Sequence, residues 1–124
     1  MLRPNEAVVS QGIVVTKAAL RAADRLGVTA RMLSAVIGVS EATISRMRRE
    51  EFMLEHGSKP FELAVLFTRL FRSLDAIAGG DETVSRAWLK SENSALGGVP
   101  LERILTVTGL VDAIAYLDAR RALV

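Results

Sequence analysis

The chain has 124 residues, of which 50% are hydrophobic and 24% charged, and its 16 basic and 14 acidic side chains leave a net charge of +2. This length and composition are typical of one compact globular unit and exclude wholesale disorder. Because cysteine is absent and His56 is the lone histidine, the sequence excludes a disulfide framework, a thiol nucleophile and a metal site that needs two histidines.

The sequence shows no feature of a secreted, membrane or catalytic protein. The N-terminus carries charge where a signal peptide needs an apolar core, and the most apolar stretch, residues 63–67, is far too short to span a bilayer. We therefore expect a cytoplasmic protein that does not bind a membrane. No nucleophile–base pair, paired carboxylates or metal cluster stands out, so we expect no enzyme activity, no catalytic residue, no metal and no cofactor.

The excess positive charge lies in the first half of the chain. Residues 1–57 hold 8 basic and 6 acidic side chains, whereas residues 58–124 hold 8 of each. The basic side chains gather at Arg46, Arg48 and Arg49. A net charge of +2 is small for a protein that binds nucleic acid through phosphates alone, so any specific binding must come from where these arginines point.

Few stretches alternate apolar and polar residues with the period of a strand, so the pattern predicts an all-α chain. The first part, residues 1–12, is predicted to be a flexible arm. A helix follows over residues 13–26, and two shorter helices over 29–37 and 40–49. Residues 50–58 then form the expected hinge before the second half.

The second half is also predicted to be helical. A proline opens a long helix over residues 60–78, and its apolar face is broad enough for several neighbours or for a dimer seam. Asp81 caps the next helix, and a turn-rich loop covers residues 91–98. A short helix over residues 100–105 and a final helix that begins after Gly109 complete the chain.

The pattern of residues 30–49 is the most specific in the sequence. Two helices at a fixed angle need apolar residues where they touch and a small residue at the corner. Gly38 supplies that corner. The expected inward positions are all apolar: Leu33, Ile37, Val39, Ile44 and Met47. The pattern favours a DNA-binding helix-turn-helix; the alternative is a helical hairpin in a core, with its arginines on a solvated face.

With the inward face assigned, the outward face of the second helix becomes the candidate DNA-binding surface. Arg46 is best placed to read guanine with two hydrogen bonds, and its neighbouring hydroxyls are within reach of phosphates or base edges. Glu41 either stabilises the helix start or accepts a hydrogen bond from cytosine. The candidate DNA-binding residues are Ser40, Glu41, Thr43, Ser45, Arg46 and Arg49. A dimer is expected, since two such helices must lie one turn of DNA apart.

Both halves resemble known modules. The helix-turn-helix resembles the Xre (Cro/repressor-like) type, and residues 87–101 resemble the signature of the Xre/MbcA/ParS toxin-binding domain. A Pro-Asn pair frequent in that family is Glu92-Asn93 here. The positions that match are Trp88, Leu89, Asn93, Ala95, Leu96, Gly97, Pro100, Leu101, Leu105 and Gly109.

The resemblance implies an antitoxin of a type II toxin–antitoxin system. Its partner would be a RES-domain toxin, an NAD-using enzyme that degrades NAD or transfers ADP-ribose, and the helix-turn-helix would repress the shared operon by binding operator DNA. The expected assembly is a homodimer within a toxin–antitoxin hetero-oligomer. The expected parts are the arm (1–12), an Xre-like helix-turn-helix domain (13–57) and a helical dimerisation and toxin-binding domain (58–124). The alternative is a stand-alone dimeric helix-turn-helix regulator.

The toxin-binding residues are expected on the last helix and on the loop of the signature. Most of them lie off the apolar stripe of that helix, and tyrosine and arginine are frequent interface hot spots. The candidates are Asn93, Tyr116, Asp118, Arg120, Arg121, Leu123 and Val124. Asn93 is also expected to bond to its own loop backbone, and the alternative for the chain end is a frayed turn.

Overall fold

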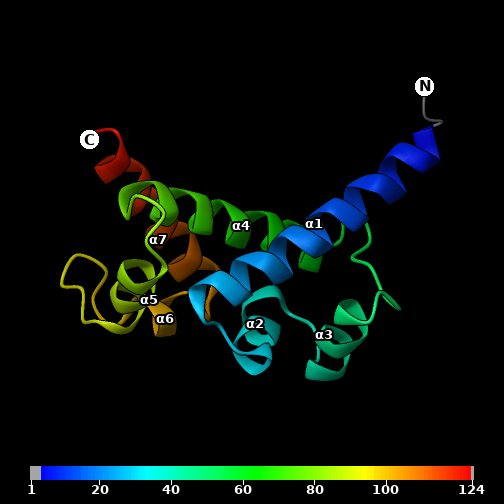
Figure 1. The fold of residues 1–124 in the computed structure, drawn as a ribbon, viewed down its shortest axis with the longest axis horizontal. Coiled ribbons are helices and arrows are strands. Elements are labelled where there is room, and N and C mark those ends of the chain that lie inside the picture. The colour runs from blue at the N-terminus through cyan, green and yellow to red at the C-terminus, as the bar shows by residue number, and fades with distance from the viewer. Residues whose placement is uncertain (1–3, 124) are drawn as a thin grey trace.

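The computed structural model describes residues 4–123, which form seven helices and no strand (Figure 1). The all-α prediction is confirmed. The helices are α1 (Pro4–Leu26), α2 (Ala30–Ile37), α3 (Glu41–Arg48), α4 (Lys59–Ile77), α5 (Glu82–Lys90), α6 (Pro100–Arg103) and α7 (Val107–Arg121). None of the helices in this part of the chain combines the length and the apolar character that crossing a bilayer requires.

Side chains that accept hydrogen bonds from backbone N–H groups begin the short helices, as predicted. Thr29 caps α2, Ser40 caps α3 and Asp81 caps α5. Gly38 ends α2 in the left-handed conformation with φ of 75°, which a glycine adopts without strain. The corner of the helix-turn-helix is therefore fixed by local sequence on both of its sides.

The predicted arm is helical where the structure describes it. Residues 4–12 form the first turns of α1, so the expectation of a flexible arm over 1–12 is wrong for them; residues 1–3 lie outside the described part. Pro4 is compatible with this start, because the first turn of a helix leaves its N–H groups unbonded in any case. The added turns lie beside residues 53–56.

The loop between α3 and α4, which we expected to act as a hinge, is fixed to α1. The Thr16 hydroxyl donates to the Gly12 carbonyl at 2.7 Å and accepts from the Leu54 N–H at 2.9 Å. Leu54 is buried, and a Cβ on Gly12 would lie 2.5 Å from the Leu54 carbonyl oxygen. This close approach joins the loop to α1 and closes the helix-turn-helix module.

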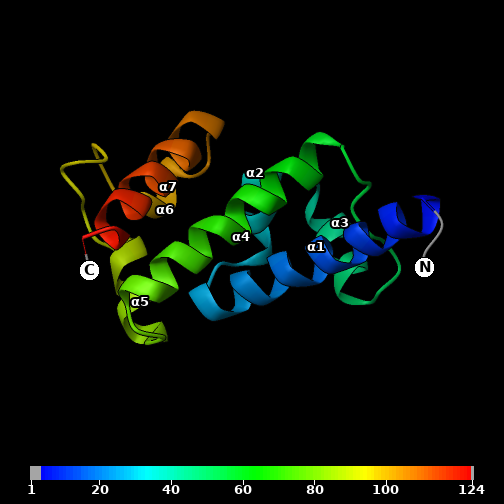
Figure 2. The ribbon, with the colours of Figure 1, turned by 90° about the horizontal axis from the view of Figure 1, so that it is seen from above.

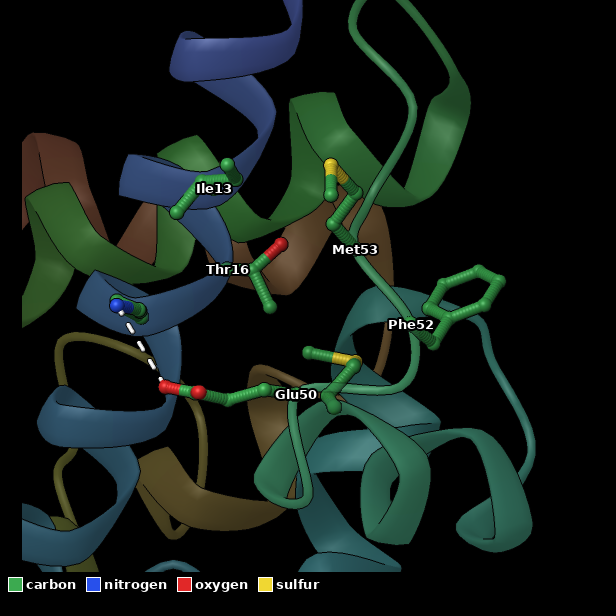
Figure 3. Close-up of a pocket in the computed structure, with 7 residues that line it drawn as sticks. Ile13, Thr16, Glu50, Phe52 and Met53 are labelled. Carbon is green, nitrogen blue, oxygen red and sulfur yellow. Dashed lines mark ion pairs between the residues drawn. The ribbon is translucent and has the colours of Figure 1, made fainter.

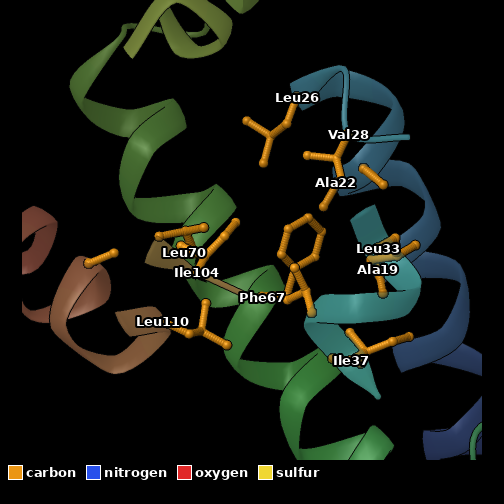
Figure 4. Close-up of a cluster of buried hydrophobic side chains, with 14 of the residues drawn as sticks. Ala19, Ala22, Leu26, Val28, Leu33, Ile37, Phe67, Leu70, Ile104 and Leu110 are labelled. Atoms are coloured by element: carbon orange, nitrogen blue, oxygen red, sulfur yellow. The ribbon is translucent and has the colours of Figure 1, made fainter. Parts of the chain in front are cut away.

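The apolar core has α4 at its centre. Figure 4 shows Phe67 pointing between the buried residues of α1 and α2, while Leu70 turns toward Ile104 and Leu110 on the other side. Helix α4 contacts α1, α2, α5 and α7. The broad apolar stripe from which the sequence predicts a dimer seam is thus occupied by neighbours in the same chain.

The start of α7 differs from the prediction. The helix begins at Val107, not after Gly109, because Thr106 caps it by accepting from the Gly109 N–H at 3.1 Å. A Cβ on Gly109 would overlap the carbonyl oxygen of Arg103. Glycine is needed here for close packing of α7 on the end of α6, not for a turn.

Truncating the central aromatic side chain tests this view of the core. We expect Phe67→Ala to lower the free energy of unfolding by about 3–5 kcal/mol, because Phe67 is fully buried and leaves a cavity. Val65→Ala, on the exposed side of the same helix, should change it by less than about 0.5 kcal/mol. Urea unfolding of the three proteins measures both values, and equal losses would contradict the assignment of α4 as the core helix.

Candidate functional site

The outer face of α3 carries five of the six candidate DNA-binding residues. Thr43 is the exception: it is 8% exposed, so its predicted outward position is wrong. Its place one turn before Met47 turns it toward the core. The exposed members are Ser40, Glu41, Ser45, Arg46 and Arg49.

Thr43 supports this face from below. Its hydroxyl shares a hydrogen bond of 2.9 Å with the Ser40 hydroxyl and accepts one of 3.1 Å from Nη2 of Arg46. Both partners lie on the exposed face. Thr43 therefore orients two candidate contact residues and does not itself reach a ligand.

Arg46 is held between a hydroxyl and an aromatic ring. Its guanidinium carbon lies 5.6 Å from the centre of the Phe52 ring, and Phe52 is 38% exposed. This stacking leaves the other guanidinium N–H groups pointing to solvent and limits the freedom of the side chain. Sequence reasoning missed Phe52, since its position after the helix gives no sign that the loop folds back under Arg46.

The other two arginines of the cluster are paired with carboxylates. Arg48 donates two hydrogen bonds to Asp24 of α1, at 2.8 and 3.2 Å. Arg49 lies 3.2 Å from a carboxylate oxygen of Glu51. Among the described residues, Arg46 is the member of the cluster that bonds a hydroxyl and a ring in place of a carboxylate, which leaves its positive charge available to an anionic partner.

A small hollow opens beside this face, between α1 and the loop that follows α3 (Figure 3). Its volume is about 180 Å³, and Ile13, Phe52 and Met53 give it apolar walls. The ion pair between Lys17 and Glu50, 3.6 Å from nitrogen to oxygen, lies at its border. The hollow is below the usual size of a site for a small-molecule ligand.

A second surface lies where α7 meets α5. The rings of Trp88 and Tyr116 stack at 6.2 Å with an angle of 20° between their planes, and the guanidinium of Arg120 lies 5.6 Å from the centre of the Tyr116 ring. Trp88, predicted as a core residue, is half-buried. Arg121 and Leu123 are exposed, and Leu123 is 88% accessible. We call Trp88, Tyr116 and Arg120 the α7 ladder.

Asp118, another candidate on α7, is engaged within the chain. The Ser73 hydroxyl donates to its carboxylate at 2.6 Å, and Nη2 of Arg69 donates at 3.0 Å. The hydrogen bond from Ser73, followed by the bond and charge of Arg69, holds the pKa of Asp118 below its ordinary value of 3.8, against an opposing effect of burial. Asp118 thus joins α7 to α4.

Asn93 closes the loop between α5 and α6, as predicted. Its side-chain oxygen accepts from the Leu96 N–H at 3.2 Å, and its backbone exchanges two hydrogen bonds with Gly98, at 3.0 and 3.1 Å. The amide oxygen is therefore used in shaping the loop. Val124, the last candidate, lies outside the described residues.

Comparison with known families accounts for nearly all of the chain. Residues 6–69, more than half of it, match the antitoxin Xre-like helix-turn-helix domain, and residues 73–122 match the antitoxin Xre/MbcA/ParS C-terminal toxin-binding domain. No curated protein matches the chain. The two matches meet inside α4, the helix against which both halves pack.

The contacts of Asp118 predict a stability that depends on pH. Because its pKa is lowered in the folded chain, its carboxylate stabilises the fold above pH 3.8, and this contribution is lost as the pH falls below that value. The difference in unfolding free energy between the natural chain and Asp118→Asn should therefore shrink in acid. Urea unfolding at a series of pH values measures it.

Ser73→Ala is the matched variant, because it removes the hydrogen bond that lowers this pKa most. It should reduce the dependence on pH while leaving Asp118 in place. A difference between the natural chain and Asp118→Asn that stays constant from neutral to acid pH would contradict the assignment.

Proposed function

The chain belongs to the antitoxin Xre-like helix-turn-helix family, and we propose that its partner is a RES-domain toxin that uses NAD. In this proposal the protein is the antitoxin of a type II system: it binds and occludes the toxin with its C-terminal domain and represses its own operon through α3. The observation that supports both roles together is that Arg46 and the α7 ladder lie at opposite ends of the fold (Figure 2).

On the toxin side, the α7 ladder and the residues after it form the proposed contact. Tyr116 and Arg120 present a ring and a guanidinium in fixed relation, which is the chemistry of an interface hot spot. Arg120 and Arg121 would meet carboxylates that the toxin otherwise uses on its substrate. Leu123 would add an apolar contact at the border of the NAD pocket. Asn93 contributes by holding its loop.

On the DNA side, Arg46 is the proposed reader of a guanine, and Ser40, Ser45 and Arg49 are the proposed phosphate contacts. Glu41 remains next to the positive end of α3, where a carboxylate is favoured. Because one helix reads only a half-site, the proposed DNA-binding form is a homodimer within the toxin–antitoxin complex.

Co-expression with the product of the neighbouring gene is the test of the toxin role. If the proposal holds, a RES-domain protein is encoded there, it arrests growth when expressed alone, and it is neutralised by and purifies with this chain. A stand-alone regulator would bind DNA but would neither rescue growth nor retain the neighbouring protein in a pull-down.

Arg46→Ala tests the DNA role separately. We expect it to weaken binding to the operator by about 1–3 kcal/mol, since it removes a bidentate base contact, while toxin inhibition stays unchanged. Arg72→Ala, an exposed arginine on α4, is the matched control and should bind the operator normally. Fluorescence anisotropy at fixed salt measures the affinity, and an equal loss of toxin inhibition in Arg46→Ala would contradict the separation of the two surfaces.

Deletion of residues 119–124 tests the toxin contact. The shortened chain loses Arg120 and Arg121 but keeps the buried residues of α7, so helicity measured by circular dichroism should be retained while neutralisation in a growth assay is abolished. Full protection by the shortened chain would show that the toxin binds elsewhere.

A further inference from the structure

Five large apolar side chains remain exposed together at one end of the molecule. On the N-terminal half of α1, which projects past the start of α4 in Figures 1 and 2, Val9, Ile13 and Val14 are 49%, 36% and 64% exposed. On the adjoining loop, Phe52 and Met53 are 38% and 43% exposed. We call these five residues the α1 patch. Isolated exposed apolar residues are ordinary, but a contiguous group marks a surface that a partner covers.

The sequence of α1 around the patch is complementary to itself. Its helical repeat places Glu6, Ile13 and Lys17 on one face, with an acidic residue at one end of the apolar stretch and a basic residue at the other. If two copies of α1 cross antiparallel about a two-fold axis between residues 11 and 12, Glu6 of each copy faces Lys17 of the other. The same register sets Val9 against Val14. A two-fold interface needs this self-complementarity.

We propose that the α1 patch is the interface through which two copies of this chain form a dimer. The core supports this choice over α4, whose apolar stripe is already filled by helices of its own chain. The hollow of about 180 Å³ beside Ile13 gives the partner's valines a place to insert. Lys17 is 61% exposed even while it pairs with Glu50, so it is accessible to the partner's carboxylate.

The α1 patch also connects dimer formation to the DNA-reading face. Phe52 belongs to the patch and carries Arg46 on its ring, so a second copy that covers the patch would fix the orientation of Arg46. This link rests on the proposed DNA role, whereas the dimer itself does not. The test therefore uses the full chain alone, without toxin or operator.

Sedimentation equilibrium across micromolar concentrations is the experiment. The natural chain should form a dimer, and Ile13→Asp should raise its dissociation constant by about 30-fold or more, the effect of losing an interface hot spot. Val84→Asp, at a similarly exposed valine on α5, is the matched control and should leave the dimer intact. Circular dichroism checks that the variants are folded.

A charge exchange tests the register. Glu6→Lys and Lys17→Glu should each weaken the dimer, and the double variant should restore it, because opposite charges again face each other. A monomeric natural chain, a dimer insensitive to Ile13→Asp, dissociation caused by Val65→Asp on α4 in its place, or a double variant no better than the single ones would each overturn the proposal.

Discussion

Burial of apolar side chains from both halves against α4 is the constraint on which the structure depends. Phe67 and Leu70, one turn apart, serve opposite neighbours: the helix-turn-helix on one side, and α6 and α7 on the other. Neither half has a separate core. The two family matches meet within this helix, so the boundary between the modules runs through shared packing and not through a linker.

The two candidate surfaces are built by similar means. On α3, a buried threonine hydroxyl and an aromatic ring from the following loop hold Arg46. On α7, a tryptophan from α5 supports Tyr116, which in turn lies beneath Arg120. In each case a side chain distant in sequence or in another element restricts an exposed arginine, which lowers the entropy lost when a partner binds.

Local features of the sequence predicted the helices, their caps and the helix-turn-helix, because Thr29, Ser40 and Gly38 act within their own turns. What it could not predict depends on contacts between distant residues. Thr16 bonds Leu54 across 38 positions, and this contact fixes the loop expected to be a hinge. Thr43 could not be distinguished from its exposed neighbours by polarity, and its burial follows from the packing around it.

The 19 residues of α4 form one uninterrupted helix, which at its usual rise spans about 28 Å. A rod of that length, with a nucleic-acid-facing module packed at one end and the aromatic ladder at the other, keeps two bulky ligands from colliding. Simultaneous occupancy of the chain is then geometrically permitted, and gene control does not require release of the captured enzyme.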